Sequence, residues 1–332
     1  MTDRASLTLI VPGMARELAH TDPAPEAPRL AHLAARGSLR HAWDRSDLTQ
    51  GALCAWQRGL LWALQLAVPE HPSAALTALA NDLTSEGDWL HAEPVHLVAG
   101  LNHLSLIELA GELQLSPQHS AACEAAVREH LQACGLRLHV LRSGRWLMQM
   151  PRRLELGAFC PAAAAANELE RAMPQGADAA ALRRLMTELQ MLLHEHPVNQ
   201  QRALQGLPAA NSLWLWGNGS AEASRQPLPP AFGSEDYLRG IYRLHAASLQ
   251  PAPASSGELL GALTGCARAV ALLDPQPASK FEQQWLTPLV EGLRARRLAR
   301  LDLVLDSWHL SIDRRGLRRF WRRPLPPASW VA

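Results

Sequence analysis

The sequence predicts an α/β protein in which a layered α/β core carries an inserted α+β domain. Strand-like and helix-like segments alternate at both ends of the chain, as in a core whose strands lie between helices. A middle segment has a different order (strand, strand, helix, strand, strand), which is typical of a compact α+β unit. The chain has 332 residues, 48% of them hydrophobic, which is enough to bury such a core. We therefore expect residues 1–85 and 195–332 to form the discontinuous core, and residues 86–194 to form the inserted domain with its return helix.

The N-terminal part predicts one strand and several short helices. Leu7 to Val11 is an almost continuous apolar run closed by Pro12-Gly13, which predicts a buried strand ending in a turn. The segment PRLAHLAARG has its apolar residues on one face and ends at Gly37, so it predicts a short helix with a glycine stop. Residues 54–66 and 73–80 predict two further helices.

The middle segment predicts the inserted domain. DWLHAEPVHLVAG and LNHLSLIEL alternate apolar and polar residues, which indicates two strands. A helix is expected from Pro117 to Cys134, because Ser116 before a proline is a favourable helix start. LRLHVLRSGRWLMQM predicts a hairpin around Ser143-Gly144. Asp178 to His194 is the clearest helix, with leucine and methionine recurring at spacings of three and four.

The C-terminal part returns to the core pattern. Asn211 to Trp216 predicts a buried core strand, closed by Gly217-Asn218-Gly219. Residues 220–235 are rich in proline, serine and glycine and predict a loop. The remaining elements are a strand or helix at 237–249, a strand at 267–274, a helix at 281–297 and a strand at 301–307.

Charge and composition argue against several classes of protein. The formal net charge of +1 provides no general attraction to nucleic acid or an anionic membrane, and no window approaches 18 apolar residues. The cysteines number five and include no C-x-x-C pair, and the N-terminus lacks the layout of a signal peptide. Reduced, mostly buried thiols in a cytoplasmic protein are therefore expected. The sequence also contains no P-loop, Rossmann glycine fingerprint, G-x-S-x-G or H-E-x-x-H motif.

The C-terminal end is strongly basic, with RARRLAR at 294–300 and RRGLRRFWRR at 314–323. Such a run is either a solvated face paired with carboxylates or a surface for an anion, a nucleic acid or a partner protein. Both interpretations remain open at this point.

The stretch HEHPVNQQRALQGLPAANSLWLWGNG is the first candidate site. It places Asn199, Arg202 and Asn211 before a predicted strand that ends in a glycine turn. Arginine and asparagine suit a phosphate or carboxylate ligand, and ligands of open α/β sheets lie beyond the carboxyl ends of strands. The alternative is a polar joint, in which His196 and Asn199 cap the helix end and Asn211 bonds loop backbone.

Two further groups could hold a metal ion. His91, Glu93, His96 and His103 lie in the two predicted strands of the inserted domain, where scattered histidines are more often ordinary polar residues. Asp274, Asp306 and His309 follow predicted core strands, which is where a metal-dependent hydrolase holds its ions. The alternative for this second group is a set of ordinary turn residues at strand ends.

The order of these motifs resembles that of the archaeal-type, cofactor-independent phosphoglycerate mutases. HPVNQQRALQGLPAANSLWLWGNG is similar to that family's segment h-P-v-N-x-x-R-x-x-x-G-x-x-x-A-N, and PRLAHLAARG is similar to an early helix shared across the alkaline-phosphatase-like superfamily. EPVHLVAGLNHLSLIELAGEL is similar to the start of the family's inserted domain, and FEQQWLTPLVEGLRARRLARLDLVLDSWH to its late helix and strand. The character is nearest to a bacterial regulatory branch, the E-type proteins of the regulation-of-pathogenicity-factors cluster. The resemblance implies an alkaline-phosphatase-like layered core with an inserted α+β domain.

The departures from the family pattern concern the catalytic residues. Active members carry Asp-Gly after the first strand, where this chain has Pro12-Gly13, and proline cannot bind a metal ion. Active members then supply a serine or threonine nucleophile, and only Ser46 and Thr49 lie in that region here, without the surrounding motif. The later aspartate and histidine cluster is reduced to Asp274, Asp306 and His309. We therefore expect phosphoryl transfer to be largely lost.

Three functions are compatible with this resemblance. The first is a catalytically impaired, mutase-like protein with a regulatory role, in which Asn199, Arg202, Asn211, His196 and Arg145 contact a small phosphorylated or carboxylated ligand. The second is a metal-dependent phosphoglycerate mutase or phosphatase with altered ligands, which would use Mn²⁺ or Mg²⁺. The third is an interaction module whose Arg- and Trp-rich C-terminus binds a protein or a nucleic acid, although the overall charge argues against nucleic acid. We expect the first.

Overall fold

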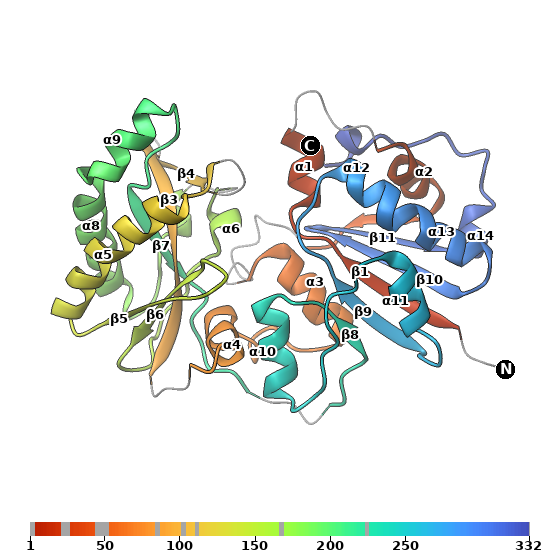
Figure 1. The fold of residues 1–332 in the computed structure, drawn as a ribbon, viewed down its shortest axis with the longest axis horizontal. Coiled ribbons are helices and arrows are strands. Elements are labelled where there is room, and N and C mark those ends of the chain that lie inside the picture. The colour runs from red at the N-terminus through yellow and green to blue at the C-terminus, as the bar shows by residue number, and fades with distance from the viewer. Residues whose placement is uncertain are drawn as a thin grey trace. The chain divides into compact units, whose positions relative to one another are not determined.

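The computed structural model describes the chain as an α/β protein, as the sequence predicts. The described residues are 4–20, 27–43, 53–83, 87–100, 104–109, 113–165, 169–222 and 226–331. The chain divides into two compact units (Figure 1). Unit 1 comprises Met1–Asp44, Ala55–Ala67 and Ser224–Ala332, and unit 2 comprises Arg45–Cys54 and Val68–Ala223.

The sheet of unit 1 has the strand order β2-β11-β10-β1-β9-β8. Its strands are β1 (Ala5–Ile10), β2 (Ser38–His41), β8 (Ala231–Phe232), β9 (Arg268–Leu272), β10 (Leu298–Leu305) and β11 (Trp308–Asp313). The apolar run that predicts a buried strand forms β1, which pairs in parallel with both β9 and β10. Leu9 and Ile10 of β1 point to opposite faces of the sheet and are both completely buried, as expected for a strand covered on both faces. The other edge is antiparallel, because β10 turns back into β11 and β11 pairs with β2.

Helices cover both faces of this sheet. They are α1 (Met14–His20), α2 (Pro28–Arg36), α3 (Ala55–Leu64), α10 (Asp236–Leu244), α11 (Ser256–Ala262), α12 (Ala278–Phe281), a π-helical turn (Glu282–Leu286), α13 (Thr287–Arg294) and α14 (Arg314–Leu317), with a final 3-10 turn at Pro327–Ser329. The largest apolar core joins α1, α2, α11 and α13 to one face of the sheet. On the other face α3 approaches so closely that a Cβ on Gly59 would lie 2.5 Å from Val304 Cγ1. The result is the layered α/β arrangement that the sequence predicts.

Gly37 ends α2 for a packing reason. Its φ of −87° is open to any residue. A Cβ at this position, however, would lie 2.5 Å from the backbone oxygen of Ser311 in β11. The glycine therefore allows α2 to enter β2 directly against the neighbouring strand.

The sheet of unit 2 is antiparallel in all of its pairings. Its strands are β3 (Asp88–Ala99), β4 (Leu104–Glu108), β5 (Arg137–Val140), β6 (Trp146–Met150) and β7 (Ser212–Trp216). The helices of unit 2 are α4 (Ser73–Ala80), α5 (Pro117–Ala133), α6 (Pro161–Ala165), α7 (Leu169–Ala172), α8 (Ala179–His194) and α9 (Pro197–Leu204). The central strand is β3, which pairs with β4, β6 and β7 along its length. The apolar stripe of α8 packs with α5 and β7 in a single core.

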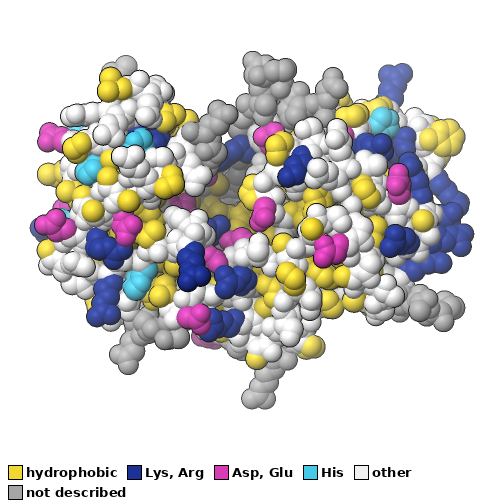
Figure 2. Space-filling model, viewed as in Figure 1, with side chains coloured by type: hydrophobic (Ala, Val, Ile, Leu, Met, Phe, Trp, Pro, Cys, Tyr) yellow, Lys and Arg dark blue, Asp and Glu magenta, His cyan; other side chains and the backbone are white. Residues whose placement is uncertain are grey.

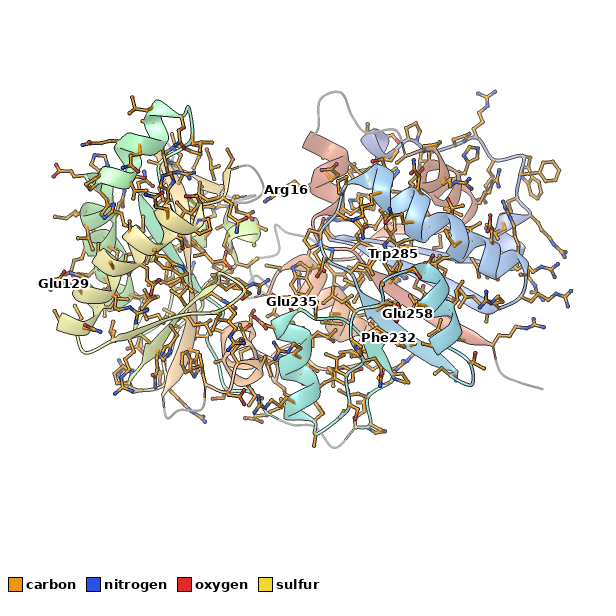
Figure 3. The ribbon with its side chains drawn as sticks, viewed as in Figure 1. Arg16, Glu129, Phe232, Glu235, Glu258 and Trp285 are labelled. Carbon is orange, nitrogen blue, oxygen red and sulfur yellow. The ribbon has the colours of Figure 1, made fainter. Side chains whose placement is uncertain are left out.

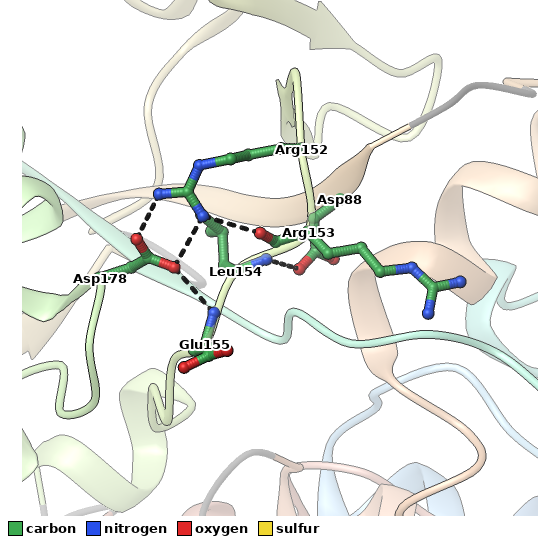
Figure 4. A network of polar contacts seen from close by, with 6 residues as sticks. All are labelled: Asp88, Arg152, Arg153, Leu154, Glu155 and Asp178. Atoms are coloured by element: carbon green, nitrogen blue, oxygen red, sulfur yellow. Dashed lines mark hydrogen bonds and ion pairs between the residues drawn. The ribbon is translucent and has the colours of Figure 1, made fainter.

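A polar network fixes the connection after β6 (Figure 4). Arg152 donates to both carboxylate oxygens of Asp178, just before α8, and one of these oxygens also accepts from the Glu155 backbone N–H at 2.8 Å. Asp88, at the start of β3, accepts from the Leu154 N–H at 3.2 Å. These bonds fix residues 152–155, which follow β6, against the start of β3 and the start of α8.

The structure corrects several boundaries predicted from the sequence. The prediction assigns residues 195–223 and the strand at 212–216 to the core, but β7 pairs with β3 and belongs to unit 2. Pro197 does mark the end of α8, but it also begins a new helix, α9, in place of the expected loop. The segment predicted at 237–249 as a strand or helix contains the helix α10, which ends at Leu244. The hairpin strand β11 is not predicted. No helix within the described ranges is long and apolar enough to cross a membrane.

Candidate functional site

The turn between β1 and α1 is the first place to look for chemistry, because this is where the resemblance predicts a metal ligand. Pro12-Gly13 occupies the turn, with Gly13 at a φ of 78°. Asp306 Oδ1 accepts from the Gly13 N–H and Oδ2 accepts from the Ala15 N–H, both at 2.8 Å. Asp306 itself lies in the hairpin between β10 and β11 with a φ of 51°. Its carboxylate therefore stabilises the start of α1, where free N–H groups favour a negative charge.

His309 lies nearby in sequence but has different partners. Its Nε2 lies 2.9 Å from Asp302 Oδ1, and its Nδ1 accepts from Arg40 Nε at 3.1 Å. The bond from Arg40 makes Nδ1 the acceptor, so the hydrogen of a neutral ring lies on Nε2, toward the aspartate. Burial alone would raise the pKa of Asp302, but hydrogen bonds from His309 and Arg300 hold that pKa below its ordinary value. The ring is almost fully buried and packs against Trp62, with centroids 4.6 Å apart.

The three metal candidates of unit 1 do not form a common site. Asp274 follows β9 and is exposed, whereas Asp306 and His309 are engaged as described. Across the part of the chain that the structure describes, one group of three His, Cys, Asp or Glu residues has its ligand atoms within 4.8 Å of one another, and it lies in unit 2. A shared Mn²⁺ or Mg²⁺ ion needs several carboxylate oxygens directed at one point. Asp274, Asp306 and His309 therefore do not fit such an ion.

The first sequence candidate, around α9, is a tightly bonded joint. Asn199 donates to the Leu193 and Ala210 carbonyls at 2.7 and 3.2 Å and accepts from the Ala210 N–H at 2.8 Å. Asn211 makes a matched pair of bonds with the Leu97 backbone in β3, at 2.8 and 2.9 Å. His196 caps the start of α9 by accepting from the Val198 N–H.

Arg202 is the most buried of these residues, with none of its surface exposed. Its guanidinium donates to three backbone carbonyls, those of Pro208, Leu113 and Gln114, at 2.7, 2.7 and 3.4 Å. Burial lowers the pKa of this arginine from its ordinary value. The glycine turn after β7 is also occupied by protein, because the Gly217 carbonyl accepts from the Ala74 N–H at the start of α4. The groups that could bind a ligand here hold backbone instead, and a ligand role for them stays a prediction.

A second cluster in unit 2 contains Arg145. His91 is fully buried, its Nε2 lies 2.9 Å from Ser73 Oγ, and its ring stacks on Trp216 with centroids 4.5 Å apart. Burial lowers the pKa of His91 to about 3, and the charge of Arg145 acts in the same direction. Burial raises the pKa of Glu93 to about 7, against the opposing effect of Arg145. Burial therefore lowers the pKa of His91 and raises that of Glu93, and the charge of Arg145 lowers both.

The other histidines that the sequence offers as metal ligands lie apart from this cluster. His96 projects from the opposite face of β3 and bonds the Ala209 carbonyl through Nδ1 at 2.9 Å. His103 lies outside the described residues. Ser46 and Thr49, the candidate nucleophiles, also lie outside them. A metal site at His91, Glu93 and His96 is absent from the described part of unit 2.

An arginine-lined pocket in unit 1 is the feature that sequence analysis misses. It encloses about 370 Å³ between α2, β2, β11 and α14. Its walls include Arg36, Arg40, Arg300 and Arg319, with His309 and Ser311. Asp313 also lines it, so four arginines and one aspartate contribute to its walls. Figure 2 shows arginine side chains gathered over this end of unit 1, at the right of the view.

Two of the pocket arginines are held in place by protein groups. Arg319 NH1 donates to the Arg36 carbonyl at 3.1 Å, and Arg300 is held by Asp302 at 2.9 Å. Arg36 Nε is buried without a hydrogen-bond partner within the described residues. Only part of this arrangement is visible in the sequence, as the basic runs at 294–300 and 314–323. Arg36 and Arg40 flank β2, and no motif signals that β11 brings them beside those runs.

The comparisons with known proteins point in one direction. The chain is similar to the 2,3-bisphosphoglycerate-independent phosphoglycerate mutase of Methanothrix thermoacetophila, 43% identical over 68 residues that cover 20% of this chain and 16% of that protein. It is also similar to the probable enzyme of that name from Geobacter sulfurreducens, 43% identical over 49 residues that cover 15% of this chain and 12% of the relative. The third relative, from Methanosarcina mazei, is 34% identical over 55 residues, which cover 17% of this chain and 14% of that protein. The matched segments thus span about a sixth or less of the length of these relatives.

Two solved structures are similar over most of the chain at low identity. The cofactor-independent phosphoglycerate mutase from Thermoplasma acidophilum aligns over 93% of this chain and 90% of its own, with a TM-score of 0.37 and 14% identity. The PH0037 protein from Pyrococcus horikoshii aligns over 93% of this chain and 88% of its own, with a TM-score of 0.45 and 14% identity. No family model matches the sequence.

Proposed function

We propose that this chain is a mutase-like protein of the alkaline-phosphatase-like superfamily that has lost phosphoryl transfer and binds a small phosphorylated or carboxylated ligand in a regulatory role. The local matches to phosphoglycerate mutases support the relationship. The single observation that carries the loss of catalysis is the position of Asp306, whose two carboxylate oxygens accept from the Gly13 and Ala15 N–H groups. The regulatory part rests on the resemblance to the bacterial branch.

The loss of catalysis is explained by the requirements of the reaction. Two-metal phosphoryl transfer needs carboxylates that hold both ions and a nucleophile placed in line with the phosphorus atom. Pro12 offers no ligand atom, Asp306 uses its charge on the start of α1, and both ring nitrogens of His309 have protein partners. Binding a metal at any of these positions would first break hydrogen bonds that stabilise unit 1.

The arginine-lined pocket supports ligand binding. Phosphate and carboxylate oxygens accept bidentate hydrogen bonds from guanidinium groups, and several guanidinium groups around one pocket favour a multiply charged anion. A volume of about 370 Å³ suits a small molecule rather than a nucleotide cofactor with its full set of contacts. His309, which also lines the pocket, is almost fully buried, so this part of the wall is held by the core of unit 1.

The first experiment tests for catalysis. Purified full-length protein is assayed for interconversion of 2- and 3-phosphoglycerate with Mn²⁺ and with Mg²⁺, beside an active mutase as positive control. We expect no turnover above the buffer rate. Turnover that is lost in Asp306→Ala but kept in Asp274→Ala would overturn the proposal and establish a metal enzyme with altered ligands.

The second experiment tests the pocket. Calorimetric titration with 3-phosphoglycerate and with inorganic phosphate is compared for the wild type, Arg40→Gln and Arg294→Gln. Arg40 lines the pocket, whereas Arg294 is exposed at the end of α13. Arg294→Gln therefore removes the same charge from unit 1 outside the pocket. We expect Arg40→Gln to weaken binding at least about tenfold, the equivalent of one guanidinium contact. If both variants weakened binding equally, the loss would come from the overall charge of the protein, and the pocket would not be the binding site.

A second candidate function is supported by the exposed aromatic pair Phe320 and Trp321. They are 77% and 69% exposed and stack edge to face at 5.5 Å. Tryptophan and arginine together are typical of the residues that dominate binding energy in protein interfaces. An acidic protein partner fits this surface. Trp321→Ala would abolish its capture in a pull-down and leave thermal unfolding unchanged, whereas capture of nucleic acid alone would exclude a protein partner.

A further inference from the structure

We infer that His130, Cys134 and Glu188 of unit 2 form a zinc site with an open fourth position. Among the described residues they are the one group of three potential ligands whose atoms lie within 4.8 Å of one another. None of them is part of the proposed ligand pocket in unit 1, so the inference is independent of the proposed function.

The two helices that supply these residues already place them on facing sides. His130 lies in the last turn of α5 and Cys134 is the residue that ends it. Residues four apart on a helix share a face, so the imidazole and the thiol project together. Glu188 comes from α8, which packs against α5 in the core of unit 2. Figure 1 shows α5 and α8 side by side, so a bound ion would link two helices that are distant in sequence.

The distances from His130 Nε2 to the other two ligand atoms are close to those around a tetrahedral ion, and all three atoms lie within 4.8 Å of one another. His130 Nε2 lies 3.3 Å from Glu188 Oε2 and 4.0 Å from Cys134 Sγ. With zinc–nitrogen, zinc–oxygen and zinc–sulfur bonds of about 2.0, 2.0 and 2.3 Å, the corresponding edges of a tetrahedron are roughly 3.3 Å and 3.5 Å. The first distance already matches, and the second needs a side-chain shift of a few tenths of an ångström. Cys134 is exposed, so that shift is unobstructed on its solvent side.

The surrounding residues prepare Glu188 as a ligand. Arg184 donates through Nε to Glu188 Oε1 at 3.0 Å, which leaves Oε2 facing His130. An orienting partner of this kind fixes the ligand and raises metal affinity in known sites.

The chemistry of the three donors selects the ion. A thiolate, an imidazole and a carboxylate together favour Zn²⁺, whereas Mg²⁺ and Ca²⁺ prefer oxygen ligands alone. Three protein ligands leave one position for water or an incoming ligand. Cys134 and Glu188 also line a cavity of about 330 Å³, which has Leu136, Met150 and Leu185 in its walls. An exchangeable ligand at the open position would therefore enter from a mostly apolar cavity.

The experiment is a titration of full-length, reduced protein with Zn²⁺ and with Co²⁺ as a spectroscopic substitute. We expect one equivalent of Zn²⁺ to bind by calorimetry, and Co²⁺ to give the thiolate charge-transfer absorption of a tetrahedral site. Cys134→Ser is expected to abolish that absorption, and His130→Gln and Glu188→Gln are each expected to weaken zinc binding at least about tenfold. Cys266→Ser is the matched control, because it removes another partly exposed thiol that lies in unit 1.

Two outcomes would overturn the inference. The first is the absence of stoichiometric zinc binding at micromolar protein. The second is an affinity and a Co²⁺ spectrum that are unchanged in Cys134→Ser and His130→Gln, which would assign the bound metal to other residues. Thermal unfolding of each variant without metal verifies that the fold is intact. Failure of this test leaves the phosphate titrations of unit 1 unaffected.

Discussion

Glu93 offers the sharpest test of the electrostatics of unit 2. It lies half-buried on β3, and burial raises its pKa from 4.5 to about 7. Arg145 lowers this pKa, Glu108 raises it, and the Trp216 indole lowers it. The net result is that removal from water outweighs the neighbouring positive charge.

The sign and size of the effect on stability can be worked out from this shift. Below pH 4.5 Glu93 is protonated in both the folded and the unfolded state, so it does not change the free energy of unfolding. Between pH 4.5 and about 7 the unfolded state ionises while the folded state keeps its proton, so the free energy of unfolding falls as the pH rises. The fall amounts to about 1.4 kcal/mol per pKa unit, or about 3 kcal/mol at most above pH 7. Partial solvent access at this position reduces that figure.

The variant Glu93→Gln removes the titration and nearly keeps the shape. Its stability relative to wild type is expected to be similar at pH 4.5 and greater by up to about 3 kcal/mol at pH 8. Urea denaturation at both pH values measures the difference, and hydrogen exchange of β3 peptides reports unit 2 directly. Glu129→Gln is the control, because Glu129 is exposed and Figure 3 shows it projecting outward from α5. A Glu93→Gln difference that is the same at both pH values would refute the reasoning.

Three further predictions concern stability. Asp306→Asn should destabilise unit 1 by about 1–3 kcal/mol, because it weakens two charge-assisted bonds to the start of α1, whereas Asp274→Asn at an exposed position should have little effect in the same urea titration. Arg202→Met should destabilise unit 2 by about 3 kcal/mol or more, because it leaves buried carbonyls without donors; a melting temperature equal to that of wild type would contradict this role. Gly37→Ala should lower the melting temperature, since its Cβ would meet backbone at 2.5 Å, whereas Gly261→Ala in α11 has open space and should be neutral or stabilising.

Local sequence patterns predicted helices and strands well where the apolar residues follow a single regular spacing. The continuous apolar run of β1 and the spacing of three and four in α8 each have one physical solution, a buried strand and an amphipathic helix. Ser116 before Pro117 also predicted the start of α5, where its side chain accepts from the His119 N–H. These features depend on residues close in sequence.

Pairing between distant segments was harder to predict. By its sequence the apolar strand β7 is equally compatible with either sheet, and its backbone pairing with β3, together with the Asn211 bonds to Leu97, determines which one it joins. Asp306 was expected at a strand end but not on the start of α1, some 290 residues earlier in the chain. The arginine-lined pocket was missed for the same reason, because its walls come from α2, β2, β11 and α14. Three-dimensional proximity of this kind leaves no periodic signal.

The carboxylate of Asp306 has a consequence for any free anion that approaches the β1–α1 turn. A tethered group competes at an effective concentration on the order of millimolar or above, because it cannot diffuse away. Asp306 therefore acts as a built-in competitor at the position where a phosphate would otherwise meet the helix start. An external phosphate would gain these N–H groups only by displacing a partner that is always present. The N–H groups of this turn are thus already occupied by a side chain of the same protein.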